Sequence, residues 1–120
     1  MDVIKLSPDI IGQYIDGGVD FPVIVYGGVE NRSVLGVGGL CWTDGQCFAW
    51  LDVFGDMSAH SLVLFRQARR MLKVARQLGE TEVFVYRDEH PNSAKLLAML
   101  GFEPAGFHEA IGKEIFRCQV

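Results

Sequence analysis

The stretch His90-Pro91-Asn92-Ser93-Ala94-Lys95-Leu96-Leu97-Ala98-Met99-Leu100-Gly101-Phe102-Glu103 contains the start, the apolar face and the end of one helix. Proline is favoured in the first turn of a helix, so Pro91-Asn92-Ser93 marks the start. Three leucines then follow at helical spacing and form an apolar stripe. Gly101 is typical of a helix end, because glycine adopts the left-handed conformation without strain. The stretch therefore predicts a short helix that runs into Leu-Gly-Phe.

Upstream of this helix, the sequence predicts a long helix and a short strand. Over residues 61–78 the apolar residues recur at steps of three and four, which is the spacing of one helical face. Those residues are Leu62, Phe65, Ala68, Met71, Leu72, Ala75 and Leu78. Gly79 marks the end of the long helix. Val83-Phe84-Val85-Tyr86 then reads as a strand of β-branched and aromatic residues.

Three strands precede the long helix, over residues 21–29, 33–42 and 46–54, and predict an antiparallel meander. Asp44-Gly45 is a strong signal for a two-residue hairpin turn, which would pair Trp42 with Cys47 and Cys41 with Phe48. The strand over 46–54 is apolar on both faces, which predicts a central strand that is covered on both sides. A short strand over 3–6 comes first.

Between the first strand and the meander, Ser7 or Asp9 would cap a short helix. Its apolar residues are Ile10, Ile11, Tyr14 and Ile15. Two further strands are predicted near the end of the chain, around Gly106-Phe107-His108 and Ile115-Phe116-Arg117. A helix between strands usually makes a right-handed crossover to a parallel neighbour. The expected fold class is α/β (α+β): one domain over residues 1–120, with a mixed, mostly antiparallel sheet of about six to seven strands and helices on its faces.

Composition narrows the function classes. The chain has 120 residues and a formal net charge of -4, so it lacks the basic balance of a nucleic-acid binder. No apolar run is long enough to span a bilayer, and the first residues do not resemble a signal peptide, so a cytoplasmic location is expected. The hairpin places Cys41 and Cys47 on opposite faces of a sheet, which argues against a disulfide between them. No cysteine or histidine cluster points to a metal.

The helix stretch, together with the order of elements, resembles the GNAT superfamily of acyl-CoA N-acyltransferases. Ser93, Leu96 and Leu100-Gly101-Phe102-Glu103 match the family's pattern, and residues 30–36 resemble its hairpin between the second and third strands. The resemblance implies an acyl-CoA such as acetyl-CoA, an amine acceptor, and a binding cleft where the fourth and fifth strands splay apart. In this family, backbone groups of the fourth strand hold the pantetheine arm. A glycine-rich loop at the start of the long helix holds the pyrophosphate, where free amides and the helix dipole favour an anion.

The sequence departs from the family at three places. The loop pattern of Arg or Gln, two residues, Gly, one residue, then Gly or Ala is replaced by Met57, His60 and Leu62, and Asp56 adds a negative charge. Leu97 stands where the family usually has a proton-donating tyrosine. The segment before the second strand has room for one short helix, where most members have two. If acyl-CoA binds, the resemblance implies contacts from Val53, Phe54, Met57, Ser58, Ala59, His60 and Ser61.

Candidate catalytic residues lie at the ends of the fourth and fifth strands. Asp52 is placed to act as a general base toward an amine, or is an ordinary polar residue at a strand end. Tyr86 and His90 follow the fifth strand, where each is either a proton donor or a surface residue. His60 is either a base or phosphate donor at the helix start, or an exposed first-turn histidine.

One side of the long helix is basic. The residues concerned are Arg66, Arg69, Arg70, Lys73 and Arg76, with no acid between them. They either contact the CoA 3′-phosphate, a nucleic acid or an acidic partner, or form a solvated helix face.

Two functions follow from these patterns. The first is an acyl-CoA-dependent N-acetyltransferase whose altered loop binds CoA weakly or not at all. The second is a non-catalytic member of the fold that serves as a structural or interaction module, with a protein partner or as a homo-oligomer. The short front and altered loop also resemble GNAT-like internal proteins of short-tailed phage particles, which favours a virion or host-cell role for that second function.

Overall fold

The computed structural model describes residues 1–9, 23–55, 58–87 and 93–120. The short helix predicted over 10–15 lies outside this part of the chain, as do the candidates Met57 and His90 and the loop residue Asp56.

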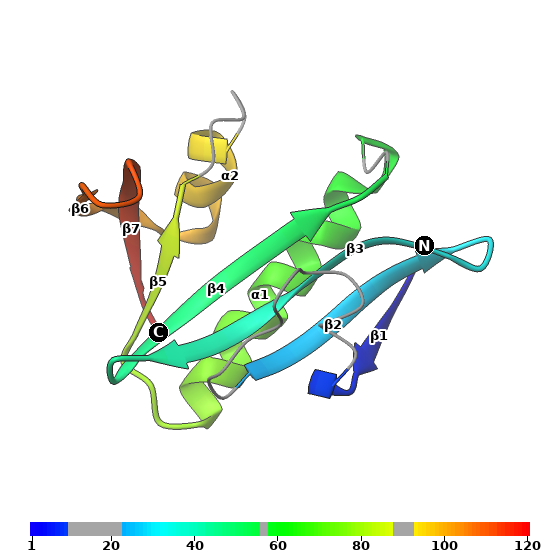
Figure 1. Cartoon of the computed structure of the whole chain (residues 1–120), viewed down its shortest axis with the longest axis horizontal. Helices are drawn as coiled ribbons and strands as arrows, with labels where there is room; N and C mark the ends of the chain where they lie inside the picture. Colours follow the sequence, from blue (N-terminus) through cyan, green and yellow to red (C-terminus); the bar gives the residue numbers. More distant parts are fainter. Residues whose placement is uncertain (10–22, 56–57, 88–92) are drawn as a thin grey trace.

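Within the described residues, seven strands form one sheet in the order β1-β2-β3-β4-β5-β7-β6. Their bounds are β1 (Asp2–Leu6), β2 (Val23–Glu30), β3 (Ser33–Thr43), β4 (Gln46–Val53), β5 (Glu82–Tyr86), β6 (Glu103–His108) and β7 (Lys113–Gln119). Neighbouring strands are antiparallel except β4 and β5, which are parallel. The predicted meander and the predicted crossover to a parallel strand are therefore confirmed (Figure 1).

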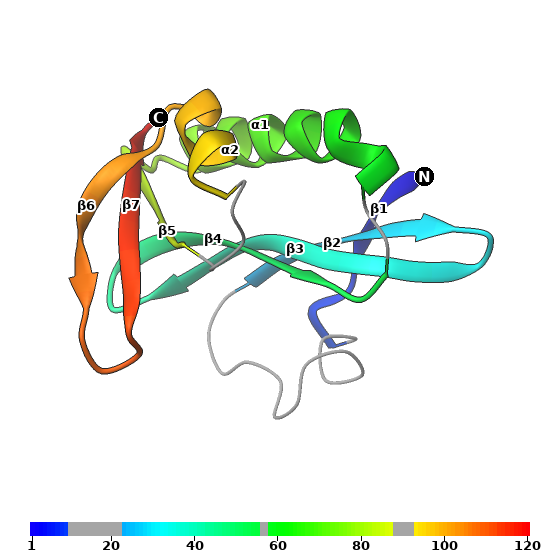
Figure 2. The same ribbon diagram turned by 90° about the horizontal axis from the view of Figure 1, so that it is seen from above.

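The 3₁₀ helix η2 (Ser58–His60) leads directly into the long helix α1 (Ser61–Gln77), and α2 (Ser93–Leu100) is the short helix before β6. Both described α-helices lie on the same face of the sheet (Figure 2). The reason is a shared core, because both helices contribute buried residues to one apolar cluster. Its members are Leu40, Cys47, Met71, Ala75, Val83, Leu97, Phe102, Phe116 and Cys118.

The β3–β4 hairpin is formed as the sequence predicts. Asp44 and Gly45 have φ angles of 52° and 76°, which are the positive values that a type I′ turn requires. Trp42 pairs with Cys47, and Cys41 pairs with Phe48. The turn therefore fixes which β4 side chains face the helices, since successive residues of a strand point to opposite faces.

Two expectations about apolar surfaces were wrong. Leu62 and Leu78 are 60% and 56% exposed, because they lie at the two ends of α1, beyond the turns that the sheet covers. The strand β4 is not covered along its whole length. Leu51 and Val53 are 51% and 49% exposed in its second half, although Phe48 in its first half is buried. The cover is lost because β5 diverges from β4 at this point.

The three cysteines are free, as the sequence predicts for Cys41 and Cys47, and all three are buried. Desolvation by burial raises the pKa of Cys41 from 9.0 to about 11. Burial, with smaller effects from Glu80 and Cys41, raises the pKa of Cys47 from 9.0 to about 12. The pKa of Cys118 is also raised, by burial first and then by Glu103. Each thiol therefore stays protonated at neutral pH, and the thiolate is the reactive form.

We expect all three cysteines to resist alkylation in the folded protein. At pH 8, iodoacetamide should modify the native chain at least about 100-fold more slowly than the chain unfolded in urea, because a raised pKa leaves little thiolate. Mass spectrometry of timed samples gives the number of modified thiols. Rapid modification of native Cys41 or Cys47 would contradict their burial.

Candidate functional site

A cleft opens between β4 and β5. Among the described residues, pairing between these strands is confined to Phe48↔Phe84. Beyond that pair, β4 continues to Val53 and β5 continues to Tyr86, and Figure 1 shows the two strands moving apart. A splayed parallel pair leaves the inner edge of each strand without a ladder partner. The predicted splay between the fourth and fifth strands is therefore present.

The backbone of β4 offers hydrogen-bonding groups to this cleft. The Phe54 N–H donates to the Leu35 carbonyl oxygen at 2.8 Å, so the amide of Phe54 points toward β3. Backbone groups of successive strand residues point to opposite sides. The N–H and C=O groups of Val53, and those of Leu51 two residues earlier, therefore point toward β5, where the described residues of that strand do not pair with them. Val53 is thus available to a ligand, whereas the amide of Phe54 is already in use.

A largely apolar cavity of about 410 Å³ continues from the cleft into the space between α1 and the sheet. Its floor includes Gly36 and Gly38 of β3, which have no side chains to fill it. The residues that form its β4, β5 and helix walls include Ala49, Leu51, Val63, Leu64, Ala68, Met71, Val85 and Leu97. A polar side chain, Gln67 of α1, also borders the cavity, and its buried Nε2 has no hydrogen-bond partner among the described residues. The cleft thus has an apolar interior with few polar groups, which is typical of a small-molecule site.

The catalytic candidates Asp52 and Tyr86 flank the cleft from its two strands, and both border the cavity. Phe48 and Phe84 are paired and their rings are 5.7 Å apart, so they share a face. Asp52 lies four residues after Phe48, and Tyr86 two residues after Phe84, so both side chains lie on that face, which points away from α1. Asp52 is exposed, while the Tyr86 ring stacks on Phe48 with centroids 5.2 Å apart.

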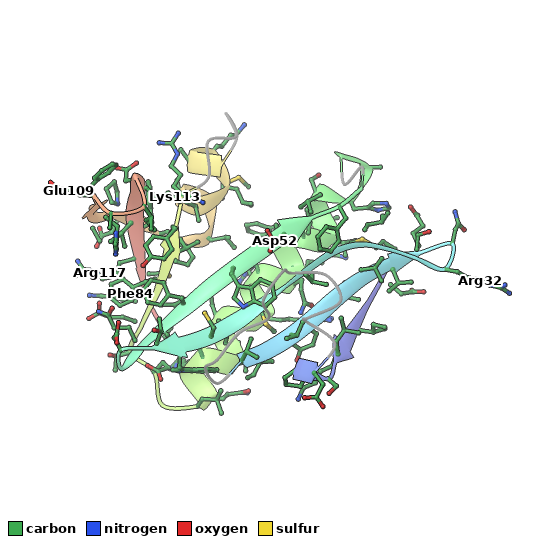
Figure 3. All side chains as sticks on the ribbon, in the orientation of Figure 1. Arg32, Asp52, Phe84, Glu109, Lys113 and Arg117 are labelled. Carbon is green, nitrogen blue, oxygen red and sulfur yellow. The ribbon has the colours of Figure 1, made fainter. Side chains whose placement is uncertain are left out.

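Two further features surround these candidates. The ring of His108 meets the Tyr86 ring edge-on at 6.0 Å, so Tyr86 is held between aromatic neighbours. Figure 3 shows Asp52 on β4, apart from Arg32 at the tip of the β2–β3 hairpin and from Arg117 on β7. The Asp52 carboxylate has no hydrogen-bond or ion-pair partner among the described residues. Its carboxylate is therefore free to accept a proton from a molecule in the cleft.

The entry to α1 differs from an open phosphate-binding loop. Residues 58–60 form a 3₁₀ turn, and no side chain caps the first turn of α1. The side chain of His60 is 15% exposed, and its Nε2 lies 3.1 Å from Oε2 of Glu30. His60 therefore ties the start of α1 to the end of β2, and the expectation of an exposed first-turn histidine was wrong. Ala59 and Ser61 are exposed at the same turn, beside the acidic Glu30.

Leu97 stands where the resemblance to the GNAT superfamily would place a proton-donating tyrosine. It is 8% exposed, belongs to the main core and forms part of the cavity wall. An aliphatic side chain cannot transfer a proton, so any acid for a leaving group must come from elsewhere.

The basic side of α1 lies on the surface. Its members Arg66, Arg69, Arg70, Lys73 and Arg76 are all exposed. None of them forms an ion pair with another described residue, although the Arg69 guanidinium lies 5.9 Å from the centroid of the Phe65 ring. None of the five borders the cavity.

Some features of the site were missed by sequence reasoning. Gln67 interrupts the apolar side of α1 between Leu64 and Met71, and this was the available signal. The importance of Gly36 and Gly38 depends on which face of β3 points toward α1, and that is set by tertiary packing.

In the described part of the chain, no cluster of three His, Cys, Asp or Glu residues is placed to hold a metal ion. Nor is any described helix long and apolar enough to cross a membrane.

Comparisons with known proteins connect this geometry to a known fold. No protein-family model matches the sequence, and a search of curated proteins gives no match. The fold is similar to that of the IAA acetyltransferase from Bacillus cereus, with a TM-score of 0.68 and 12% identity over 99% of both chains. It is also similar to the PaiA N-acetyltransferase from Thermoplasma acidophilum in complex with coenzyme A, with a TM-score of 0.66 and 12% identity. That match covers 82% of this chain and 61% of the Thermoplasma chain, so this chain spans about three fifths of that enzyme.

A third similar structure is the Bacillus subtilis acetyltransferase in complex with CoA. Its TM-score is 0.64, with 13% identity over 95% of this chain and 84% of that one. The chain therefore has the fold of the GNAT acetyltransferases, a mixed sheet of mostly antiparallel strands with two helices, and two of these three similar structures hold CoA.

Proposed function

We propose that the protein belongs to the GNAT superfamily and is an acyl-CoA-dependent N-acyltransferase. The observation that carries this proposal is the open cleft between β4 and β5, with the free backbone edge of Leu51 and Val53 beside an apolar cavity. Neither His60 nor Leu62, two of the residues that replace the glycine pattern, borders that cavity. Fold alone does not define an activity, and the proposal therefore rests on this site.

The pantetheine arm of acyl-CoA would lie along β4. Its amide groups alternate donors and acceptors, and they can pair with the exposed backbone edge in the way that a peptide adds to a sheet. That edge also supplies N–H groups that polarise the thioester carbonyl, as oxyanion donors do. The arm would enter from the side covered by α1, and the acceptor amine would approach from the face that carries Asp52 and Tyr86.

Transfer would proceed by direct attack. The amine nitrogen bonds to the thioester carbon, and the carbon–sulfur bond breaks as the CoA thiolate leaves. The Asp52 carboxylate would take the proton that the amine loses, directly or through water. The thiolate then receives a proton from Tyr86 or from solvent, because Leu97 has none to give. Most of the catalysis would come from holding the amine and thioester in place.

CoA is expected to bind weakly. The 3₁₀ turn at residues 58–60 replaces a glycine loop, and Glu30 places a negative charge beside the start of α1. Calorimetric titration of the full chain with CoA and acetyl-CoA should give dissociation constants of about 0.1–1 mM, together with a small rise in melting temperature. Micromolar affinity for CoA would show that the turn still holds a pyrophosphate. Failure of CoA, acetyl-CoA and a longer acyl-CoA all to bind at millimolar concentration would overturn the proposed function.

A second candidate function is a non-catalytic interaction module. The observation that favours it is the row of exposed cations on α1, which have no ion-pair partner among the described residues and are complementary to an acidic partner. Under this function the titrations would show no binding of CoA, and the protein would associate with an acidic macromolecule. A phage origin would belong to this candidate, although none of the three similar structures described above is a phage protein. The acceptor, a homo-oligomeric state and a cytoplasmic location likewise stay predictions.

A further inference from the structure

The cavity extends well beyond the place where a thioester would lie. Its lining starts at Leu51 and Val85 on the two sides of the cleft, and it continues beneath α1 to Tyr26 of β2 and Val3 of β1. Strands are spaced by about 4.8 Å, so the distance from β4 to β2 is roughly 10 Å. An acetyl group would occupy a small part of this space.

Backbone packing keeps this space open. A Cβ atom at Gly36 would lie 2.9 Å from the carbonyl oxygen of Asp52, and one at Gly38 would lie 2.8 Å from that of Trp50. Real Cβ atoms do not approach a backbone oxygen so closely, so neither position can carry a larger residue unless β4 moves. Since both glycines lie under α1, the missing side chains leave a void that neighbouring residues do not fill. A pocket of this volume with a largely apolar lining is typical of a small-molecule site.

A buried polar group supports the same conclusion independently. Nε2 of Gln67 is buried, has no hydrogen-bond partner in the described part of the chain, and belongs to a side chain that borders the cavity. A buried donor without an acceptor is costly, so such groups are normally satisfied by protein, water or ligand. The acceptor that we assign to it is a carbonyl oxygen of a bound acyl-pantetheine.

We propose that the cavity beneath α1 holds the acyl chain of the donor, and that the preferred substrate is a medium-chain acyl-CoA such as octanoyl-CoA. This inference rests on the proposed function, because it requires the thioester to lie in the cleft between β4 and β5. A chain of this length reaches from β4 to β2, and the walls that it would touch are aliphatic. Burial of the chain also compensates for weak phosphate contacts, because each buried methylene adds affinity.

The test is a calorimetric titration of the full chain with CoA, acetyl-CoA and octanoyl-CoA, below the concentration at which octanoyl-CoA forms micelles. We expect octanoyl-CoA to bind at least about 100-fold more tightly than acetyl-CoA. Equal affinities for the three ligands would overturn the inference and leave the proposed function intact. Failure of all three to bind would overturn the proposed function itself, and the inference with it.

Substitutions in α1 test where the acyl chain binds. Ala68→Leu should fill the cavity and reduce the preference for octanoyl-CoA to within about 5-fold, because the added side chain occupies the volume of several methylenes. Ala68→Met is a more adaptable second variant in case leucine is not accommodated. Ala98→Leu makes the same change on an exposed position of α2 that does not border this cavity, and should keep the wild-type preference. If a folded Ala68 variant kept the wild-type preference for octanoyl-CoA over acetyl-CoA, the acyl chain would have to bind elsewhere.

Discussion

Replacing Asp52 by Asn should lower kcat for amine acylation by about 100-fold, with a much smaller change in the affinity for acyl-CoA. Asp52 is exposed on the face that would receive the amine, borders the cleft, and has no described partner that would neutralise its charge. The amide of Asn keeps the size of the side chain and removes its ability to accept a full proton. The measurement is thiol release from the acyl-CoA that binds most tightly, with a panel of primary amines as acceptors.

A matched control lies at the other end of the same hairpin. Asp44→Asn also removes one carboxylate, and Asn tolerates the positive φ of 52° at that turn as well as Asp does. This variant should retain wild-type kcat. Equal rates for the wild type and Asp52→Asn, with unchanged ligand affinity, would rule out a general-base role and leave catalysis to positioning alone. A loss of rate in Asp44→Asn would mean that net charge, rather than position, governs the rate.

The features that the sequence predicted well are those with local causes. The Asp44-Gly45 turn fixes its own geometry and thereby the register of β3 with β4. The leucine stripe and Gly101 define α2 within a single stretch of chain. Because these local elements follow one another in a characteristic order, they also predicted the overall topology.

The features that could not be predicted from the sequence depend on contacts between distant segments of the chain. Nothing near His60 indicates that its ring reaches Glu30, thirty residues earlier in the chain. The hydrophobicity of Leu51 and Val53 predicted burial, yet the splay of β5 leaves them exposed at the cleft. The same splay opens the cleft. The residues whose burial was wrongly predicted, Leu51 and Val53, are therefore those at the candidate site. Such exceptions to local pattern are common at functional sites.

The cleft and the start of α1 differ in how closely they follow the GNAT pattern. Under the proposed function, the free edge of β4 would hold the pantetheine arm, while the 3₁₀ turn and Glu30 are poorly suited to a pyrophosphate. Affinity for an acyl-CoA is therefore expected to come from the arm and the acyl chain more than from the phosphates. Such a protein would discriminate between acyl groups more strongly than a relative that depends on its phosphate loop, because the variable part of the ligand would supply more of the binding energy.

The glycines of the sheet allow a test of how closely its strands pack. Gly39→Ala should lower the free energy of unfolding by roughly 4 kcal/mol or prevent folding, because its Cβ would overlap the backbone oxygen of Ile24 in β2. Chemical denaturation followed by circular dichroism measures the change.

Gly27→Ala is the matched control for this change, since a Cβ there would meet the flexible end of the Leu6 side chain at 2.9 Å. We expect it to cost about 1 kcal/mol or less, because a leucine side chain can rotate away while a strand backbone cannot. If Gly39→Ala were as mild as Gly27→Ala, β2 and β3 would have room to separate. A large difference between the two variants would show that β2 and β3 pack too closely at this point to admit a side chain.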